Sequence, residues 1–417
     1  MKKALVVLAC VLLIASFLFA NGASEKAVEG NPVIWAKSGP EGTALTAAAE
    51  AYQKATGKTV DVVIQGRSGY RPAYQTALLA GSTELDAVLD TAFVVPGLAA
   101  GGHLLSIDSY IKSAKDYDLG DFDEVIKKEM SYNGEWYMFP TDISSESLVY
   151  RTDLFEKAPE TWDELIEMAK QFTKSYNPDS PTEYGFGFSG LNGVLEGTFQ
   201  GIMKAYGGSL INEETKEVTI DSENTKKAFQ VYVDMKEMGI VPPDVISWDY
   251  AEPLIALQEG VVASAQFFTA GMPDLYSEEA TPKYAGKFAY VAQPAGPYGS
   301  FTRINPLGVM VNANGQHREA TIEFLVWLTS KEGAKIYTEA GGASPRKSIM
   351  SSEEVVASRP WYEELKIAAE HGVGSIRIAE QSIIKESFNK WAALALNGDM
   401  TVSDAFDAAA KEVRDSI

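Results

Sequence analysis

At 417 residues the chain exceeds the usual size of a single hydrophobic core, so we expect two lobes or domains. Its 46% apolar and 22% charged residues are values typical of a globular protein. The formal net charge of −21 comes without a basic stretch for nucleic acid or anionic lipid, so we expect no nucleic-acid partner.

The N-terminus has the pattern of a secretory signal. Two lysines precede an apolar run over Ala4–Phe19, and small residues follow, with cleavage predicted after Ala20 or Gly22. The run is too short to favour a stable membrane span, and an uncleaved anchor is the alternative. We therefore predict a signal peptide over residues 1–22 and a periplasmic or otherwise extracytoplasmic location.

The single cysteine, Cys10, lies inside this apolar run. Too little apolar sequence precedes it for a lipidation site, so we expect no lipid anchor there. Once the signal segment is removed, the chain has no cysteine for a disulfide, a thiol nucleophile or a thiolate metal site.

Strand and helix patterns alternate from Pro32 onwards. Strands are predicted at Val33–Trp35, Val60–Ile64 and Leu85–Leu89, with helices at Ala44–Ala55 and 72–80 between them. This βαβαβ order favours a doubly wound sheet, in which ligands bind beyond the carboxyl ends of the strands. The rule directs attention to three loops: Lys37–Thr43, Gly66–Tyr74 and Asp90–Phe93.

The middle of the chain reads as strand, strand and helix. Glu135–Phe139 is rich in aromatic residues and is expected to stop at Pro140, which cannot donate to a central ladder. A polar run follows, then a second extended piece at Leu148–Tyr150. Thr161 can cap a helix while Glu164 reaches back. By itself this pattern fits any α/β core.

Further elements follow the same logic. Helices are predicted at 195–207, 222–238, 250–259 and 317–329, and strands at Val261–Phe268, Phe288–Gln293 and Leu307–Val311, with helical sequence over 352–417. Gly185–Gly190 matches G-x-G-x-x-G, but no apolar strand leads into it. We therefore predict a strand with close backbone approach there and no dinucleotide site.

The sequence offers little for catalysis. Its histidines, His103, His317 and His371, are scattered, without a metal-ligand partner at i+3 or i+4. No hydrolase, metalloprotease or P-loop motif is present. The sequence does not exclude a glycosidase with paired carboxylates, because two such residues need to be close together only in the folded protein. We therefore expect that the protein is not an enzyme and that it has neither a cofactor nor a metal site.

The order of motifs in the middle of the chain resembles family 1 of the bacterial extracellular solute-binding proteins, the sugar-capturing subunits of ABC importers. The shared pattern begins with Gly, Tyr and Pro and a polar gap. It continues with the motifs Leu148-x-Tyr150-x-x-Asp-Leu-Phe155 and Thr-Trp-Asp-Glu-Leu, the second of which begins at Thr161. Tyr150 is followed by arginine where the family usually has asparagine. Leu257–Phe268 and Glu319–Arg346 resemble further family motifs.

This resemblance implies an α/β, two-lobed periplasmic-binding-protein fold with discontinuous lobes, a hinge and an interlobe cleft. The lobes would be 32–142 plus 301–346 and 147–298 plus 350–417, with hinges near 143–146, 307–311 and 346–351. The family captures a mono- or oligosaccharide in the cleft and delivers it to membrane-embedded ABC permease subunits, and we expect a monomer. The alternatives are a receptor for a polyamine or glycerol phosphate, or a secreted carbohydrate-active enzyme. A phosphate site would need several Arg or Lys residues.

A sugar site needs aromatic faces for C–H surfaces and polar groups that converge on hydroxyls. The residues that we expect at such a site are Trp35, Ser38, Gly39, Tyr70, Asp90, Phe93, Asp142, Ser144, Trp248, Phe268, Arg303 and Arg377. Phe268 is the expected stacking platform, and Asp142 is expected to accept ligand hydroxyls. Core packing stays open for Trp35 and Phe93, a solvated loop for Tyr70, and packing on the next helix for Trp248.

Overall fold

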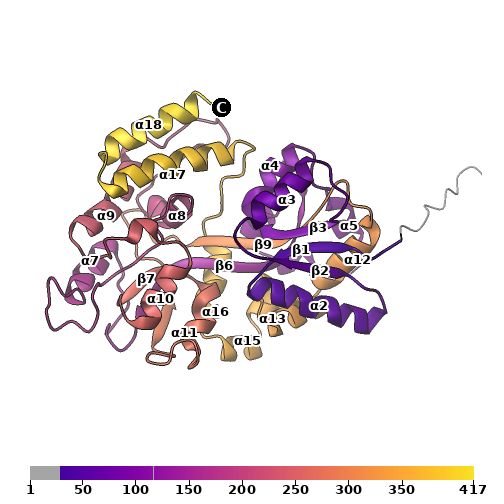
Figure 1. Cartoon of the computed structure of the whole chain (residues 1–417), viewed down its shortest axis with the longest axis horizontal. Helices are drawn as coiled ribbons and strands as arrows, with labels where there is room; N and C mark the ends of the chain where they lie inside the picture. Colours follow the sequence, from indigo (N-terminus) through magenta and orange to yellow (C-terminus); the bar gives the residue numbers. More distant parts are fainter. Residues whose placement is uncertain (1–28, 116) are drawn as a thin grey trace, which may run out of the picture. The chain divides into compact units, whose positions relative to one another are not determined.

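One mixed sheet organises the protein, whose computed structural model describes residues 29–115 and 117–417 (Figure 1). The predicted signal segment, residues 1–22 with Cys10, lies outside the described residues. The strands occur in the order β2-β1-β3-β9-β6-β7, with β8 also paired to β6. Their bounds are β1 Val33–Lys37, β2 Asp61–Gln65, β3 Ala87–Thr91, β6 Met138–Arg151, β7 Ser264–Phe268, β8 Phe288–Val291 and β9 Arg303–Val311.

The N-terminal part confirms the predicted βαβαβ order. Strands β1, β2 and β3 pair in parallel, with α2 (Pro40–Thr56) and α3 (Tyr70–Leu79) between them. Gly57 ends α2 in a left-handed conformation (φ 75°), as predicted. The helix begins earlier than expected, because Pro40 supplies the fixed φ that suits a first helical turn.

The predicted break at Pro140 is wrong. Strand β6 runs without interruption for 14 residues, through Pro140 and the polar run, and Figure 1 shows it beside β9 in the middle of the sheet. The ladder between the two strands shifts register between Pro140 and Asp142. Proline is tolerated inside the sheet here because its missing N–H coincides with a bulge. Two predicted hinge segments, 143–146 and 307–311, lie inside these paired strands.

The helices after β6 follow the predicted amphipathic segments. Thr161 caps α7 (Trp162–Gln171) by accepting from Glu164 N at 3.2 Å, and the Glu164 carboxylate accepts in return from Glu160 N at 2.7 Å. The other long helices are α8 Leu195–Ala205, α9 Glu223–Glu237, α10 Ala251–Glu259, α12 Arg318–Leu328, α13 Lys331–Glu339, α16 Tyr362–His371, α17 Gln381–Asn397 and α18 Val402–Arg414.

Short elements complete the chain. They are α4 Val95–Ala100, α5 Asp108–Ser113, α6 Glu124–Glu129, α11 Met272–Tyr276, α14 Lys347–Met350, α15 Glu353–Ser358, the hairpin β4 Ser131–Tyr132 with β5 Glu135–Trp136, and the 3₁₀ turns η1 Ala92–Val94, η2 Leu119–Asp121, η3 Val245–Ser247 and η4 Thr269–Gly271. Within the part of the chain that the structure describes, no helix has the length and apolarity that a membrane crossing requires.

The segment Gly185–Gly190 forms no strand, contrary to prediction; only Tyr184 makes an isolated bridge, to Val262. The predicted close backbone approach is present. Gln266 N donates to Gly187 O at 2.9 Å, and a Cβ at Gly185 would collide with the backbone of Ala169. A run of glycines therefore brings backbone against backbone here without regular pairing.

Helix α17 packs against α8, α9 and α18 through a cluster of buried aromatic side chains. Phe388 of α17 stacks on Phe199 of α8 at 5.4 Å between ring centroids, and Phe406 of α18 and Phe229 of α9 pack against both. Burial of such rings contributes about 1.5–3 kcal/mol each relative to exposure. This packing fixes the position of α17 relative to α8, α9 and α18.

A buried ion pair stabilises the end of the segment Glu319–Arg346. Arg346 has 1% of its side chain exposed, bonds Asp121 at 3.0 Å and donates to the carbonyl oxygens of Tyr117 and Thr329. Its guanidinium lies 4.5 Å from the ring centroid of Phe122. Each of the three guanidinium nitrogens of Arg346 therefore has a hydrogen-bond acceptor.

We predict that Arg346→Ala lowers the free energy of unfolding by about 3–5 kcal/mol, because it leaves the Asp121 carboxylate buried without its cation. Urea unfolding checks this, with Arg414→Ala as the matched control. Arg414 bonds Asp221 through two contacts of 2.8 Å, but 48% of its side chain is exposed. Arg414→Ala should lower the free energy of unfolding by about 1 kcal/mol or less. Equal losses in the two variants would contradict the prediction.

Candidate functional site

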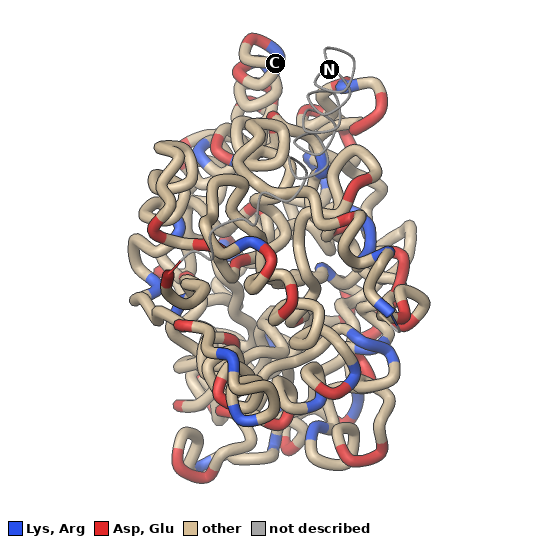
Figure 2. The backbone as a smooth tube through the Cα atoms, turned by 90° about the vertical axis from the view of Figure 1, so that its right-hand side faces the viewer, with Lys and Arg blue, Asp and Glu red and all other residues tan. Residues whose placement is uncertain are grey.

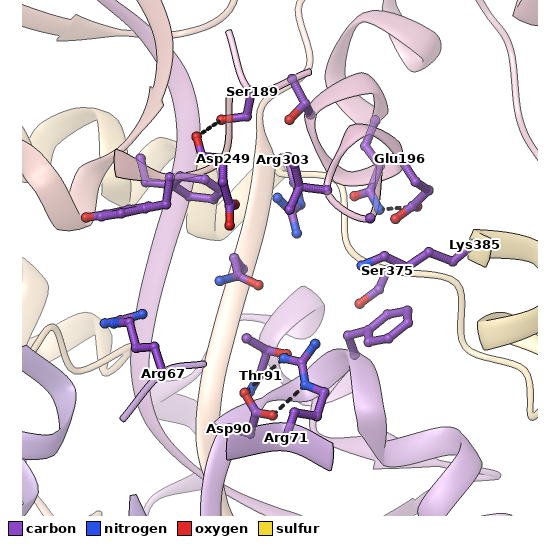
Figure 3. Close-up of a pocket in the computed structure, with 18 of the residues that line it drawn as sticks. Arg67, Arg71, Asp90, Thr91, Ser189, Glu196, Asp249, Arg303, Ser375 and Lys385 are labelled. Atoms are coloured by element: carbon purple, nitrogen blue, oxygen red, sulfur yellow. Dashed lines mark hydrogen bonds and ion pairs between the residues drawn. The ribbon is translucent and has the colours of Figure 1, made fainter. Parts of the chain in front are cut away.

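A cavity of about 400 Å³ lies beyond the carboxyl ends of β1 and β3. All three loops that the doubly wound pattern singled out contribute to its lining. One wall, which we call the first wall, comes from β1, the β2–α3 segment, β3 and η1. The second wall comes from α8, the segment before α10, the end of β7, the start of β9, and α17 with the segment before it. Figure 3 shows labelled side chains of both walls facing one another.

Asp90 organises the first wall. It is 1% exposed and accepts from Arg71 Nε at 2.7 Å and Nη2 at 3.0 Å, from Tyr74 Oη at 2.7 Å, from Thr91 N at 2.8 Å and from Lys37 Nζ at 3.4 Å. Burial raises the pKa of Asp90, but Arg71 and its other partners outweigh this effect and hold the pKa below its ordinary value. A carboxylate has about four lone-pair sites, so these donors use its capacity. Asp90 therefore fixes Arg71 and Lys37 at the edge of the cavity.

Arg303 organises the second wall. It is the first residue of β9, and its Nη1 bonds Oε2 of the fully buried Glu146 at 2.8 Å. The guanidinium lies 5.5 Å from the ring centroid of Phe268. A Cβ at Gly197 would lie 2.7 Å from Arg303 Cζ, so glycine makes room for this arginine. Burial raises the pKa of Glu146, and Arg303 opposes that rise.

Helix α8 adds polar groups to the second wall. Gln200 Nε2 donates to Glu196 Oε1 at 2.7 Å, one helical turn away on the same face. The backbone N–H of Glu196 donates to Asn389 Oδ1 at 2.7 Å, which ties α8 to α17. Gln200 Oε1 is buried and has no hydrogen-bond partner among the described residues, so the capacity of this acceptor is unused.

Aromatic rings supply the apolar surface of the cavity. Tyr250 and Phe268 lie side by side with centroids 5.9 Å apart, and Phe93 lies on the first wall. Lys385 of α17 places its ammonium 4.5 Å from the Phe93 ring centroid, so the two walls meet at this point. Such rings suit the C–H faces of a polyhydroxylated ligand.

The cavity differs in charge from the whole chain. Its lining contains five cationic residues, Lys37, Arg67, Arg71, Arg303 and Lys385, and three carboxylates, Asp90, Glu196 and Asp249. The full chain has a formal net charge of −21, and Figure 2 shows its acidic and basic residues interspersed along the backbone. The cationic lining is therefore a local property of the cavity.

A recess of about 110 Å³ adjoins the main cavity, and both share Lys37, Arg67 and Phe268. Asp142 and Ser144 line this recess, not the main cavity. Asp142 is 8% exposed and accepts from Ala343 N at 2.9 Å. Burial raises the pKa of Asp142 to about 7.

The structure brings together several of the residues predicted from the sequence. Those in the main cavity or its recess are Tyr70, Asp90, Phe93, Asp142, Ser144, Phe268 and Arg303. The hydroxyl of Tyr70 lies 2.9 Å from Trp35 O and 2.8 Å from Leu89 O, so this ring is fixed in the fold.

Other predicted residues are not among the cavity lining. Trp35 packs partly against the core, and the exposed Ser38 donates its N–H to Gln65 O beside Gly39. Trp248 is only 5% exposed and packs in the core, which is the alternative that the sequence left open. Arg377 donates to Ala92 O at 2.7 Å and to Ser131 O at 2.8 Å. Ligand contact by these residues is untested.

Sequence reasoning missed Glu196, Thr198, Gln200, Ser375 and Lys385. Glu196 and Gln200 stand four residues apart on an otherwise mostly apolar helix, which was a usable signal. No local pattern marks Lys385, because a lysine on an amphipathic helix is ordinarily part of a solvated face.

Comparisons with known proteins agree with this architecture. The family model described as "Bacterial extracellular solute-binding protein" matches residues 36–335. A probable ABC transporter-binding protein of Deinococcus radiodurans is 26% identical over 331 residues, which is 76% of each chain. The maltose-bound MalE3 of T. maritima aligns with a TM-score of 0.83 at 22% identity, over 93% of this chain and 100% of that one.

A second solved structure, the solute-binding protein of Agrobacterium radiobacter K84 in complex with ribitol, has a TM-score of 0.83 at 23% identity, over 93% of this chain and 99% of that one. At these identities the likeness shows the fold, which is the predicted two-lobed fold of periplasmic binding proteins. The predicted lobe bounds and hinges stay predictions.

We predict that Asp142 makes stability depend on pH. Its pKa of about 7 in the folded state exceeds the ordinary value of 3.8, so the folded protein binds the proton more tightly. Stability should therefore fall as pH rises between about 4 and 7. Asp142→Asn mimics the protonated acid, so its stability should not depend on this titration. The free energy of unfolding of the variant minus that of the native chain should therefore increase by about 2–3 kcal/mol from pH 5 to pH 8. Urea unfolding of both proteins at the two pH values measures this, and an unchanged difference would contradict it.

Proposed function

Because the chain belongs to the bacterial extracellular solute-binding protein family, we propose that it captures a saccharide in the cavity between its two lobes and delivers it to the permease subunits of an ABC importer. The observation that carries this proposal is the combination of aromatic rings with fixed polar side chains on both walls of one cavity. A volume of about 400 Å³ suits a small saccharide, since ligand pockets commonly measure about 300–1,000 Å³.

The arrangement suggests how binding would be coupled to closure. Arg71 and Phe93 belong to the first wall, whereas Arg303, Asp249 and Phe268 belong to the second. A ligand that contacts both walls gains its full interaction energy only when they are close together, so it shifts the population towards the closed state. The predicted export, the monomeric state and the delivery to a permease are parts of the same proposal.

We further propose that the bound solute leaves chemically unchanged. Asp90 and Glu146, the most deeply buried carboxylates at the cavity, are bonded to arginines of the walls. Carboxylates held in this way stabilise the position of a cation and do not carry a proton to a substrate. Recovery of an intact saccharide after prolonged incubation with the protein tests this point, and a hydrolysed product would contradict it.

The charges that line the cavity distinguish between the two alternative solutes, a polyamine and glycerol phosphate. A polyamine would place its positive charges among five cationic side chains, which is unfavourable. Glycerol phosphate remains a second candidate because the lining supplies several Arg and Lys residues.

We predict that a saccharide will raise the melting temperature in a panel of neutral and acidic saccharides, polyols, spermidine, glycerol phosphate and nucleotides. A ligand present at about a hundred times its dissociation constant should add about 2.7 kcal/mol of stability. Phe268→Ala should weaken binding of the active saccharide roughly two- to tenfold, because a stacking surface is lost. Tyr298→Ala is the control, since this tyrosine is 64% exposed and lies outside the cavity lining. Stabilisation by glycerol phosphate or spermidine alone would contradict the saccharide proposal.

A further inference from the structure

Lys385 differs from the other four cationic residues of the cavity. Those four pair with carboxylates: Lys37 with Glu41 and Asp90, Arg67 with Glu41, Arg71 with Asp90, and Arg303 with Glu146. Among residues 29–115 and 117–417, no carboxylate lies within ion-pair distance of Lys385. Its ammonium instead lies 4.5 Å from the ring centroid of Phe93. The cavity therefore presents one cation whose charge no acid in contact balances.

The position of Lys385 is fixed by its helix. It stands in the second turn of α17, between Gln381, whose side-chain amide donates to Phe93 O, and Asn389, which accepts from the backbone N–H of Glu196. Figure 3 shows the side chain of Lys385 extending into the cavity towards Ser375. A cation held in place at a cavity wall attracts an anion without the cost of ordering a flexible side chain.

The surroundings of Lys385 favour an anion over water. Burial lowers the pKa of Lys385; the nearby Glu196 opposes this effect, and Arg303 and Arg71 add to it. Asp90 has no acceptor capacity to offer the ligand side of the cavity, because its partners already use both oxygens. An acid group of the ligand beside Phe93 would replace the hydration that Lys385 loses on burial and would also lie near Arg71 and Arg303.

The charge of the acid group on the ligand distinguishes a carboxylate from a phosphate. Arg71 and Arg303 share their charge with Asp90 and Glu146, so Lys385 is the cation near Phe93 whose charge no carboxylate in contact offsets; Glu196 acts on it from a greater distance. Within the part of the chain that the structure describes, Glu196 and Asp249 of the second wall have no cation within ion-pair distance. Their charges would repel any anion, and a phosphate, which carries about −1.5 to −2 at neutral pH, more strongly than a carboxylate. A carboxylate, with one charge, matches Lys385.

Resting on the saccharide-binding function proposed above, we propose that the ligand is an acidic saccharide whose carboxylate meets Lys385 over the ring of Phe93. Glu196, Gln200 and Asp249 then accept from the hydroxyls of the ligand, and the remaining N–H groups of Arg71 and Arg303 donate to its oxygens. Tyr250 and Phe268 lie against its C–H faces. A sugar acid of the uronic class uses every part of this lining.

The test is calorimetric titration with matched probes: glucuronate, glucose and glucose 6-phosphate, and the corresponding galactose set. We expect at least one uronate to bind at least tenfold more tightly than both its neutral parent and its 6-phosphate. Lys385→Met, which keeps an unbranched side chain over Phe93, should weaken that uronate about 10- to 100-fold. Binding of the neutral parent should change less than about threefold, since the variant removes only a charge-assisted bond. Lys385→Arg should retain most of the preference for the acid.

Lys390→Met is the matched control. Lys390 stands on the same helix and also lies over an aromatic ring, 4.6 Å from the centroid of Trp391, but it pairs with Glu412 outside the cavity lining. This variant should leave both affinities unchanged.

Several results would overturn the inference. Equal binding of a uronate and its neutral parent, or tighter binding of the 6-phosphate, would refute the carboxylate while leaving saccharide binding in place. An equal loss for acid and neutral probes in Lys385→Met would reduce Lys385 to a structural role. If none of the probes binds and the wider saccharide panel also fails, the proposed function itself fails along with the inference.

Discussion

Strands β6 and β9 pair antiparallel from Met138 opposite Met310 to Glu146 opposite Arg303, and this one ladder positions side chains of both the second wall and the recess. Because side chains alternate between the two faces of a strand, Asp142, Ser144 and Glu146 share one face. Their partners on β9 are Leu307, Asn305 and Arg303. The first two pairs line the recess, and the third forms the ion pair of the main cavity.

The bulge beside Pro140 sets this register. A shift of one residue would turn the polar set of β6 to the opposite face, where Ser145 now bonds Tyr290 in the interior. Proline cannot donate to the ladder, so the place where the register changes is also the place where proline costs least. The polar cavity and the tolerated proline therefore have one structural cause.

Much of this fold is readable in the sequence because it rests on local periodicity. The alternation of strands and helices, the cap at Thr161 and the left-handed Gly57 all follow from residues within a few positions of one another. The continuity of β6 does not, because it depends on β9, and the paired Glu146 and Arg303 stand 157 positions apart. Nothing local marks such a partner.

The same distinction explains the outcome at Asp90. The sequence shows a carboxylate at the end of a buried strand, and physical chemistry requires a partner for it. Local reasoning could not tell whether the ligand or the protein supplies that partner. In the structure Arg71 and Tyr74, from the preceding helix, supply it. The acid predicted to bind ligand is bonded to the arginine that faces the cavity.

The paired charges also explain how an acidic protein keeps a cationic cavity. An isolated guanidinium in this wall would lose hydration without compensation, whereas a carboxylate behind it restores most of that energy. Each arginine then keeps N–H groups on its free side in a fixed geometry. The cavity is thus preorganised to donate hydrogen bonds to a ligand.

Residues 377–385 connect the two walls independently of any solute. Arg377 donates to Ala92 O, Gln381 to Phe93 O, and Lys385 lies over the Phe93 ring, so three side chains of one segment hold η1. In the proposed capture mechanism, these contacts would stabilise the closed state without a ligand, so a solute would need a smaller difference in affinity between the two states to shift the population. The guanidinium of Arg377 donates to Ala92 O and Ser131 O, so this residue ties the segment before α17 to the first wall and to the neighbouring hairpin.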